Sequence, residues 1–181
     1  MSATVVVGAG AAGLAVARQL QRRDIDAVIL EQATTGHVWG EHYEGLHLHT
    51  LKQNSALPGH EMSRELPDLP AGDEVRDYLA DYRDHFGLEV REHVSVASAR
   101  WADDEWQLRT TEGDVSARVL VAATGIWSRP VRPELPGLAT FPGPVVHSAQ
   151  YRSPEPFAGQ RVLVVGAGNS GSEIAVGLAD A

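Results

Sequence analysis

The stretch Val5-Val6-Val7-Gly8-Ala9-Gly10-Ala11-Ala12-Gly13 decides the fold of this 181-residue chain. A short β-branched run, Thr4–Val7, ends at the first glycine, and Ala11–Arg23 is rich in Ala, Leu, Arg and Gln, which favour helix. A second apolar run, Ala27–Leu30, follows. A strand, a helix and a second strand in this order predict a right-handed βαβ unit with parallel strands.

The three glycines of this turn form the pattern GxGxxG, which is typical of dinucleotide-binding sites. Gly8 lets the chain turn tightly, Gly10 lets a pyrophosphate approach the backbone, and Gly13 lets helix and strand pack closely. The helix N-terminus supplies unpaired N–H donors to the anion. Glu31 ends the second strand 18 residues after Gly13, where an acid accepts hydrogen bonds from ribose hydroxyls. The turn, strand, helix and acid together predict a bound dinucleotide.

A near copy of this turn lies at the other end of the sequence, where Leu163-Val164-Val165-Gly166-Ala167-Gly168 repeats Val5–Gly10. We expect a strand over Arg161–Val165, a turn over Gly166–Gly171 and the start of a helix over Ser172–Ala181. Two such turns in one chain are the arrangement of a flavoenzyme that passes a hydride from a nicotinamide to a flavin. The two turns therefore predict a flavin dinucleotide and a nicotinamide dinucleotide as cofactors.

The sequence between the two turns predicts a mixed region. Residues 32–70 lack periodicity and are expected to form a long irregular excursion, whereas Gly72–Gly87 has apolar residues at helical spacing and ends in glycine. Prolines make residues 128–144 an extended connector. Trp101 and Trp106 are expected to form a cross-strand pair. Antiparallel strands, with a hairpin at Glu112–Asp114, are expected over Leu88–Val94, Val96–Trp101, Trp106–Thr111 and Val115–Thr124.

These elements predict the α/β class, with a Rossmann-like flavoprotein fold for two dinucleotides. We expect a parallel βαβ FAD-binding domain with an antiparallel β meander over residues 1–140, a connector over 141–160, and the start of a second Rossmann domain, for NAD(P)H, over 161–181. Because the second unit reaches Ala181 part-way through its helix, we expect an incomplete enzyme. Its expected partner is another copy of the chain, in a homo-oligomer, or a second polypeptide that completes the fold.

The segment before the second glycine turn resembles a known family. Phe141-Pro142-Gly143-Pro144-Val145-Val146-His147-Ser148-Ala149-Gln150-Tyr151 matches FxGxxxHxxxY, the identifying sequence of the flavin-containing monooxygenases. The last position is usually Trp in Baeyer–Villiger monooxygenases, so Tyr151 favours the N/S-oxygenating and plant YUCCA-type side. Three further stretches are similar to the family's ATG turn, flavin-side loop and second fingerprint: Ala123–Gly125, Leu46–Gln53 and Gly168–Gly171.

The resemblance implies the N-terminal portion of an FAD- and NAD(P)H-dependent class B monooxygenase, with FAD and NADP(H) as the pair of cofactors. In that family NADPH reduces FAD, the reduced flavin captures O₂ as a C4a-(hydro)peroxyflavin, and one oxygen atom passes to a small organic substrate. The cofactor does the chemistry, whereas protein residues bind, orient and exclude water. The rival hypotheses are a truncated, non-catalytic flavin-binding fragment or interaction module, and another NAD(P)H–flavin oxidoreductase. A measurement of NADPH oxidation and of an oxygenated product distinguishes the monooxygenase from these alternatives.

The expected site residues are mostly cofactor ligands. By resemblance, Trp39 and Lys52 line the flavin side, Val96 contacts adenine through its backbone, and His147 and Tyr151 couple the two cofactor sites. No acid or base is assigned, and the candidates for a catalytic role are Lys52, Asn54 and His147. The expected cofactor-binding residues are Gly8, Gly10, Gly13, Glu31, Gln32, Trp39, His49, Val96, Thr124, Gly125, His147, Tyr151, Gly166, Gly168, Asn169, Ser170 and Gly171.

Composition excludes several other classes. With 15 Lys+Arg against 24 Asp+Glu, a net charge of −9 and no basic cluster, nucleic acid is not expected as a partner. The absence of cysteine removes thiol chemistry, including the redox pair that a glutathione-reductase-like enzyme needs soon after the first turn. With no leader pattern at the N-terminus and no apolar run of about 18 residues, we expect a cytoplasmic protein without a membrane partner.

Three histidines leave one alternative open. His42, His47 and His49 could bind a metal, since His47 and His49 would point the same way on a strand. Without cysteine and without an obvious fourth ligand, we favour loop histidines near the flavin and expect no metal.

Overall fold

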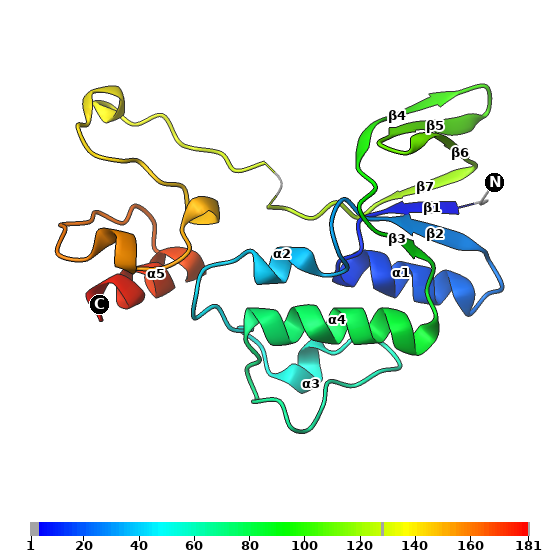
Figure 1. The fold of residues 1–181 in the computed structure, drawn as a ribbon, viewed down its shortest axis with the longest axis horizontal. Coiled ribbons are helices and arrows are strands. Elements are labelled where there is room, and N and C mark those ends of the chain that lie inside the picture. Colours follow the sequence, from blue (N-terminus) through cyan, green and yellow to red (C-terminus); the bar gives the residue numbers. More distant parts are fainter. Residues whose placement is uncertain (1–3, 128, 181) are drawn as a thin grey trace. The chain divides into compact units, whose positions relative to one another are not determined.

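The computed structural model describes residues 4–127 and 129–180, which form two compact units (Figure 1). Unit 1 comprises Met1–Gly40 and His47–Gly125, and unit 2 comprises Glu41–Leu46 and Ile126–Ala181. Six residues from the first quarter of the sequence therefore belong to the later unit. The functional domain bounds at residues 140 and 160 stay predictions.

Unit 1 is built on a four-stranded parallel sheet with the order β3-β2-β1-β7. In it β1 (Thr4–Val7) lies between β2 (Ala27–Leu30) and β7 (Val119–Ala122), and β3 (Val90–Arg91) pairs with the far side of β2. Helix α1 (Ala11–Gln21) connects β1 to β2. The predicted βαβ unit is confirmed, with both strands at their predicted bounds and a helix two residues shorter than expected.

The main core of unit 1 lies between this sheet and two helices. Helix α4 (Gly72–Phe86) runs beside α1 on one face of the sheet (Figure 1). Val6, Leu14 and Tyr82 are fully buried there, so the interface excludes water along its length. Gly87 ends α4 with a φ of 59°, the left-handed conformation that the sequence predicts.

The long excursion contains only short elements, as predicted. Residues 32–70 are all described, and their helices are α2 (His37–Gly40) and α3 (Lys52–Ser55). Backbone groups in the remaining loop bond to neighbouring segments instead, for example Leu48 N–H to the carbonyl of Pro70 at 2.8 Å.

A second, antiparallel sheet follows α4, as predicted, and consists of β4 (Val96–Ala102), β5 (Glu105–Thr110) and β6 (Gly113–Ala117). Trp101 and Trp106 lie opposite each other, with ring centroids 5.6 Å apart, which confirms the predicted cross-strand pair.

Two strand predictions in this region need correction. A single strand over Val115–Thr124 is wrong, because the chain breaks at Arg118 and β6 and β7 join different sheets. The second half of the segment, from Val119, pairs in parallel with β1, and Val119 lies opposite Thr4. The antiparallel strand expected over Leu88–Val94 is also wrong: only the two residues of β3 form a strand, and they pair in parallel with Ile29 and Leu30.

Unit 2 has little regular structure apart from α5 (Asn169–Ala179). Three short 3₁₀ turns precede it: η1 (Leu138–Thr140), η2 (Ser148–Gln150) and η3 (Glu155–Phe157). The strand predicted over Arg161–Val165 is not formed. A strand requires a hydrogen-bonded neighbour, and none of the residues in 4–127 and 129–180 pairs with this segment. Helix α5 begins three residues earlier than predicted.

Candidate functional site

The first glycine turn lies between β1 and α1. Gly8 has a φ of 107°, which L side chains rarely adopt. A Cβ on Gly8 would lie under 3.0 Å from the carbonyl oxygen of Ala123, and a Cβ on Gly13 would lie equally close to the carbonyl oxygen of Gly8. A Cβ on Gly10 would meet nothing within 4 Å. The turn is closed by backbone at its first and third glycines and open at its second, where a pyrophosphate is expected.

The second glycine turn repeats part of this geometry, because a Cβ on Gly166 would meet nothing within 4 Å, unlike one on Gly8. Gly166 has a φ of 118°, and a Cβ on Gly171 would lie under 3.0 Å from the carbonyl oxygen of Gly166. A Cβ on Gly168 would meet nothing within 4 Å. The repeat in sequence is therefore also a repeat in backbone conformation.

The helices that follow the two turns have N-termini suited to an anion. Gly10 and Gly168 are the N-cap residues of α1 and α5; neither helix has a side-chain cap or an acidic residue in its first turn. Helix α4 differs, because Glu74 accepts a hydrogen bond from Ala71 N–H at 2.7 Å there. Backbone N–H groups and the positive end of the helix dipole thus face the two glycine turns without a carboxylate of the first turn competing for them.

Glu31 lies beside the first turn and is 5% exposed. Its Oε2 accepts a hydrogen bond from Ala9 N–H at 2.7 Å and its Oε1 one from Ala33 N–H at 3.0 Å. The buried Nδ1 of His37 lies 3.3 Å from Oε1 but has no hydrogen-bond partner of suitable geometry in the described residues. Since a carboxylate has about four acceptor positions, Glu31 retains capacity for a hydroxyl.

Several other predicted residues gather near this turn. Ala123 N–H donates to the carbonyl of Val7 at 2.9 Å, so Thr124 and Gly125 follow directly where β7 meets the glycine turn. Val96 packs against the cluster formed by Val5 and its neighbours, while Trp39 packs against the main core. Gln32 and His49 are exposed. The structure brings together the glycines, Glu31 and the 123–125 turn; the ligand contacts of all these residues stay predictions.

Lys52 and Asn54, two of the catalytic candidates, lie on α3. Lys52 Nζ donates to the carbonyl oxygens of Ser63 and Arg64, each at 3.1 Å, and to that of Leu66. An ammonium has three N–H donors, so backbone carbonyls engage all of them. Lys52 therefore ties α3 to the loop at residues 63–66. Asn54 is exposed.

The family-identifying motif lies in unit 2. The Nδ1 of His147 accepts a hydrogen bond from Ala149 N–H at 3.0 Å and so caps η2. Tyr151 is 7% exposed, and its ring centroid lies 5.8 Å from that of Phe157 and 6.2 Å from that of Tyr43. In this structure both motif residues organise the backbone and core of unit 2, and their coupling role stays a prediction.

Sequence reasoning missed a buried polar contact in this unit. The hydroxyl of Tyr43 donates to Oε2 of Glu173 at 2.6 Å, across 130 positions of sequence. Burial, reinforced by this bond, raises the pKa of Tyr43 to about 12. No local pattern marks either residue, so only the folded chain could reveal the pair.

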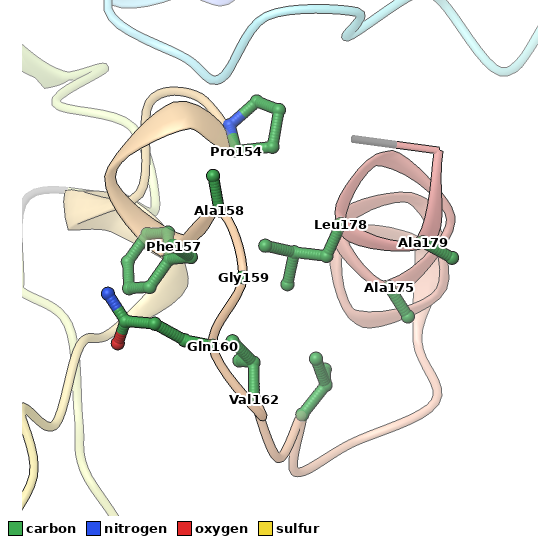
Figure 2. A pocket seen from close by; sticks show the side chains of 10 residues that line it. Pro154, Phe157, Ala158, Gly159, Gln160, Val162, Ala175, Leu178 and Ala179 are labelled. Carbon is green, nitrogen blue, oxygen red and sulfur yellow. The ribbon is translucent and has the colours of Figure 1, made fainter.

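A pocket of about 390 Å³ lies along α5 (Figure 2). Leu178 and Ala175 of the helix face Ala158 and Val162 across it, and Gln160 supplies the one amide side chain of an otherwise apolar lining. None of the predicted cofactor residues lines this hollow, so it is separate from the glycine turn of the same unit.

The histidine alternative gains no support from the backbone. The backbone of His47 forms an isolated β-bridge with Ala71 outside any strand, so the strand that would align His47 with His49 is not formed. Within residues 4–127 and 129–180, no group of three or more His, Cys, Asp or Glu side chains could hold a metal ion. In the same described ranges, every helix is too short or too polar to cross a bilayer.

A parallel sheet and an antiparallel sheet, with two glycine turns that each open a helix, are the arrangement of a flavoprotein oxidoreductase fold. The chain belongs to the pyridine nucleotide-disulphide oxidoreductase family, which matches residues 5–181.

Several relatives of this chain are flavin monooxygenases. The probable indole-3-pyruvate monooxygenase YUCCA8 of Arabidopsis thaliana is 37% identical over 188 residues, which cover 97% of this chain and 44% of the relative. The flavin-containing monooxygenase from Stenotrophomonas maltophilia superposes with a TM-score of 0.93 at 34% identity, covering 99% of this chain and 56% of that one. OTEMO, solved in complex with FAD and NADP, superposes with a TM-score of 0.76 at 25% identity, covering 99% of this chain and 37% of that one.

These relatives confirm the resemblance to flavin-containing monooxygenases and the α/β flavoprotein fold. OTEMO binds the two cofactors, FAD and NADP, that the sequence predicts for this chain. The chain spans about half the length of the relatives it matches.

Proposed function

We propose that this chain forms the FAD-binding part, and the beginning of the NAD(P)H-binding part, of a monooxygenase that inserts one oxygen atom from O₂ into a small organic substrate. The observation that supports this most is the positive φ of the first glycine and the close backbone approach of the third, which the Gly8–Gly13 and Gly166–Gly171 turns share in a chain related to flavin monooxygenases. The sequence contains no cysteine, so these residues offer no thiol for disulfide reduction.

The residues of the first turn fit FAD. Its pyrophosphate would approach Gly10 and bind the N-terminus of α1, and Glu31 would accept hydrogen bonds from ribose hydroxyls. Gln32, Trp39, His49, Val96, Thr124 and Gly125 complete the proposed set. When bound, FAD supplies the electron transfer and oxygen activation. The protein's part is to bind and orient the cofactor and to exclude water.

The residues of the second turn fit a nicotinamide dinucleotide. Gly166, Gly168 and Gly171 shape the turn, and Asn169 and Ser170 begin the helix at which the pyrophosphate would bind. His147 and Tyr151 are proposed to couple hydride delivery to oxygenation. Lys52 would act by fixing the loop at 63–66. We place the enzyme in the cytoplasm, since a cysteine-free chain suits a reducing compartment.

Matched substitutions in the two turns test this proposal in the full-length protein. Gly10→Val should remove FAD, because a branched side chain occupies the space of the pyrophosphate while meeting no protein atom within 4 Å at its Cβ. Gly168→Val should keep FAD and lose reduction by NADPH. Absorbance spectra and released-flavin chromatography measure FAD, and stopped-flow absorbance measures reduction.

The products of turnover separate the rival functions. NADPH oxidation with an oxygenated product supports the proposal. NADPH oxidation that ends in another acceptor indicates a different flavin oxidoreductase, and FAD binding without NADPH oxidation indicates a non-catalytic module. A wild-type protein that takes up no FAD would overturn the proposal outright.

A further inference from the structure

The segment Glu41–Leu46, which we call the strap, packs on unit 2 although unit 1 residues flank it in sequence. Glu44 N–H donates to the carbonyl of Arg152 at 2.8 Å, and the carboxylate of Glu41 lies 3.6 Å from the same arginine's guanidinium. The ring of His42 meets Trp127 edge to face at 5.5 Å. Contacts along most of its length therefore fix the strap to this unit.

Tyr43 is the strap's buried anchor. It is 7% exposed and forms a small core with Tyr151 and Ile174. Its hydroxyl donates to Oε2 of Glu173 at 2.6 Å.

Glu173 lies one turn after Asn169, near the beginning of α5. A charge-assisted hydrogen bond from Tyr43 to this carboxylate ties the first turns of the helix to the strap. These turns carry the backbone N–H groups that would face the pyrophosphate, so the bond fixes their position.

We propose that Tyr43 is a positioning residue for the nicotinamide dinucleotide: through its hydrogen bond to Glu173 it fixes the first turns of α5. The strap is then a functional part of the NADP(H)-binding unit. This inference rests on the proposed function, because it assigns NADP(H) to the second glycine turn.

The chemistry of the phenol suits a fixed donor. A tyrosine hydroxyl keeps its proton across the neutral range at its ordinary pKa of 10, and burial raises the pKa of Tyr43 further, to about 12, so the hydroxyl continues to donate to Glu173. This bond therefore acts as a constant brace at physiological pH.

The test measures the binding of NADP⁺ to the FAD-loaded, full-length protein by titration calorimetry. Tyr43→Phe removes the hydroxyl and keeps the ring, so we expect the Kd for NADP⁺ to rise about five- to tenfold, within the range for the loss of a typical hydrogen bond. FAD content should not change. In turnover the KM for NADPH should rise with kcat changed less, because the substitution acts on ground-state binding.

Two further variants separate positioning from general damage. Tyr82→Phe is the matched control: Tyr82 is fully buried in unit 1 and donates to the carbonyl of Pro58 at 2.9 Å, so the change should lower stability and leave the Kd for NADP⁺ unchanged. Glu173→Ala removes the acceptor and should reproduce the loss in Tyr43→Phe, with no further loss in the double variant.

Each outcome bears on one hypothesis. An unchanged Kd in Tyr43→Phe, or additive losses in the double variant, would overturn the role of Tyr43. If Tyr43→Phe does not fold, Glu173→Ala carries the test, and its unchanged Kd overturns the inference. A wild-type protein that holds FAD and binds no NADP⁺ contradicts the proposed function instead.

Discussion

The glycines of this chain differ in the atoms that an added Cβ would contact. At Gly13 a Cβ would collide with the carbonyl oxygen of Gly8, which is backbone and has no rotamer to change. At Gly177, inside α5, a Cβ would meet nothing within 4 Å. The same residue type therefore serves close approach in the first case and only weakens a helix in the second.

Alanine substitutions should have opposite effects at these two positions. Gly13→Ala should destabilise the full-length protein by about 1–3 kcal/mol, the usual range for overpacking. Gly177→Ala should stabilise it by about 0.5–1 kcal/mol through helix propensity. Urea denaturation followed by circular dichroism measures both. Equal effects at the two glycines would show that the close contact of helix and strand at Gly13 is not required.

At the scale of elements, a polar cluster joins α4, the residue after β3 and the loop before α2. Arg83 Nη1 donates to Glu92 Oε1 at 2.6 Å, and the backbone N–H of Thr35 donates to the same oxygen at 2.8 Å. Burial of Glu92 opposes ionisation, but the hydrogen bonds from Thr35 and the charges of Arg83 and His93 outweigh it. The pKa of Glu92 is therefore lowered from its ordinary value of 4.5.

A lowered carboxyl pKa makes this cluster sensitive to acid. Its contribution to stability is complete above pH 4.5 and disappears as the pH falls through the lower pKa of the folded state. Glu92→Gln should therefore destabilise the protein at pH 7, and its difference from wild type should shrink below pH 4.5. Denaturant titrations at several pH values measure this difference.

Glu89→Gln is the control for Glu92→Gln. Glu89 forms an exposed pair with Arg91 at 3.6 Å, and such pairs contribute only about 0–1 kcal/mol. Its substitution should have a small effect at every pH. A difference between Glu92→Gln and wild type that stayed constant into acid would show that the carboxylate charge does not stabilise the cluster.

At the scale of the whole molecule, unit 2 exposes apolar side chains around α5. Leu163 is 86% exposed, Val165 66% and Val176 61%. The apolar pocket of Figure 2 lies along the same helix. Exposed apolar surface of this extent is typical of a surface that another polypeptide segment covers.

We therefore expect a polypeptide of residues 1–181 to associate and not to oxidise NADPH at a measurable rate. Light scattering after size-exclusion chromatography, with an NADPH assay on each fraction, tests both statements. The double variant Leu163→Ser and Val165→Ser should reduce association. A wild-type monomer that oxidises NADPH would contradict the expectation.

The sequence by itself determined the parts of this protein that depend on neighbouring residues. Periodicity and turn chemistry predict four local features. These are the strand bounds of the first βαβ unit, both glycine turns with their positive φ, α4 with its terminal Gly87, and the pairing of Trp101 with Trp106. The motif ending at Tyr151 also identified the family without any coordinates.

Only the tertiary structure decided which distant segments meet. It divided Val115–Thr124 between two sheets, left Arg161–Val165 unpaired among the described residues, and placed the ammonium of Lys52 on loop carbonyls. It also joined Tyr43 to Glu173 across 130 positions. Strand pairing and buried hydrogen bonds need partners from elsewhere in the chain, and the identity of those partners is set by packing of the whole rather than by local sequence.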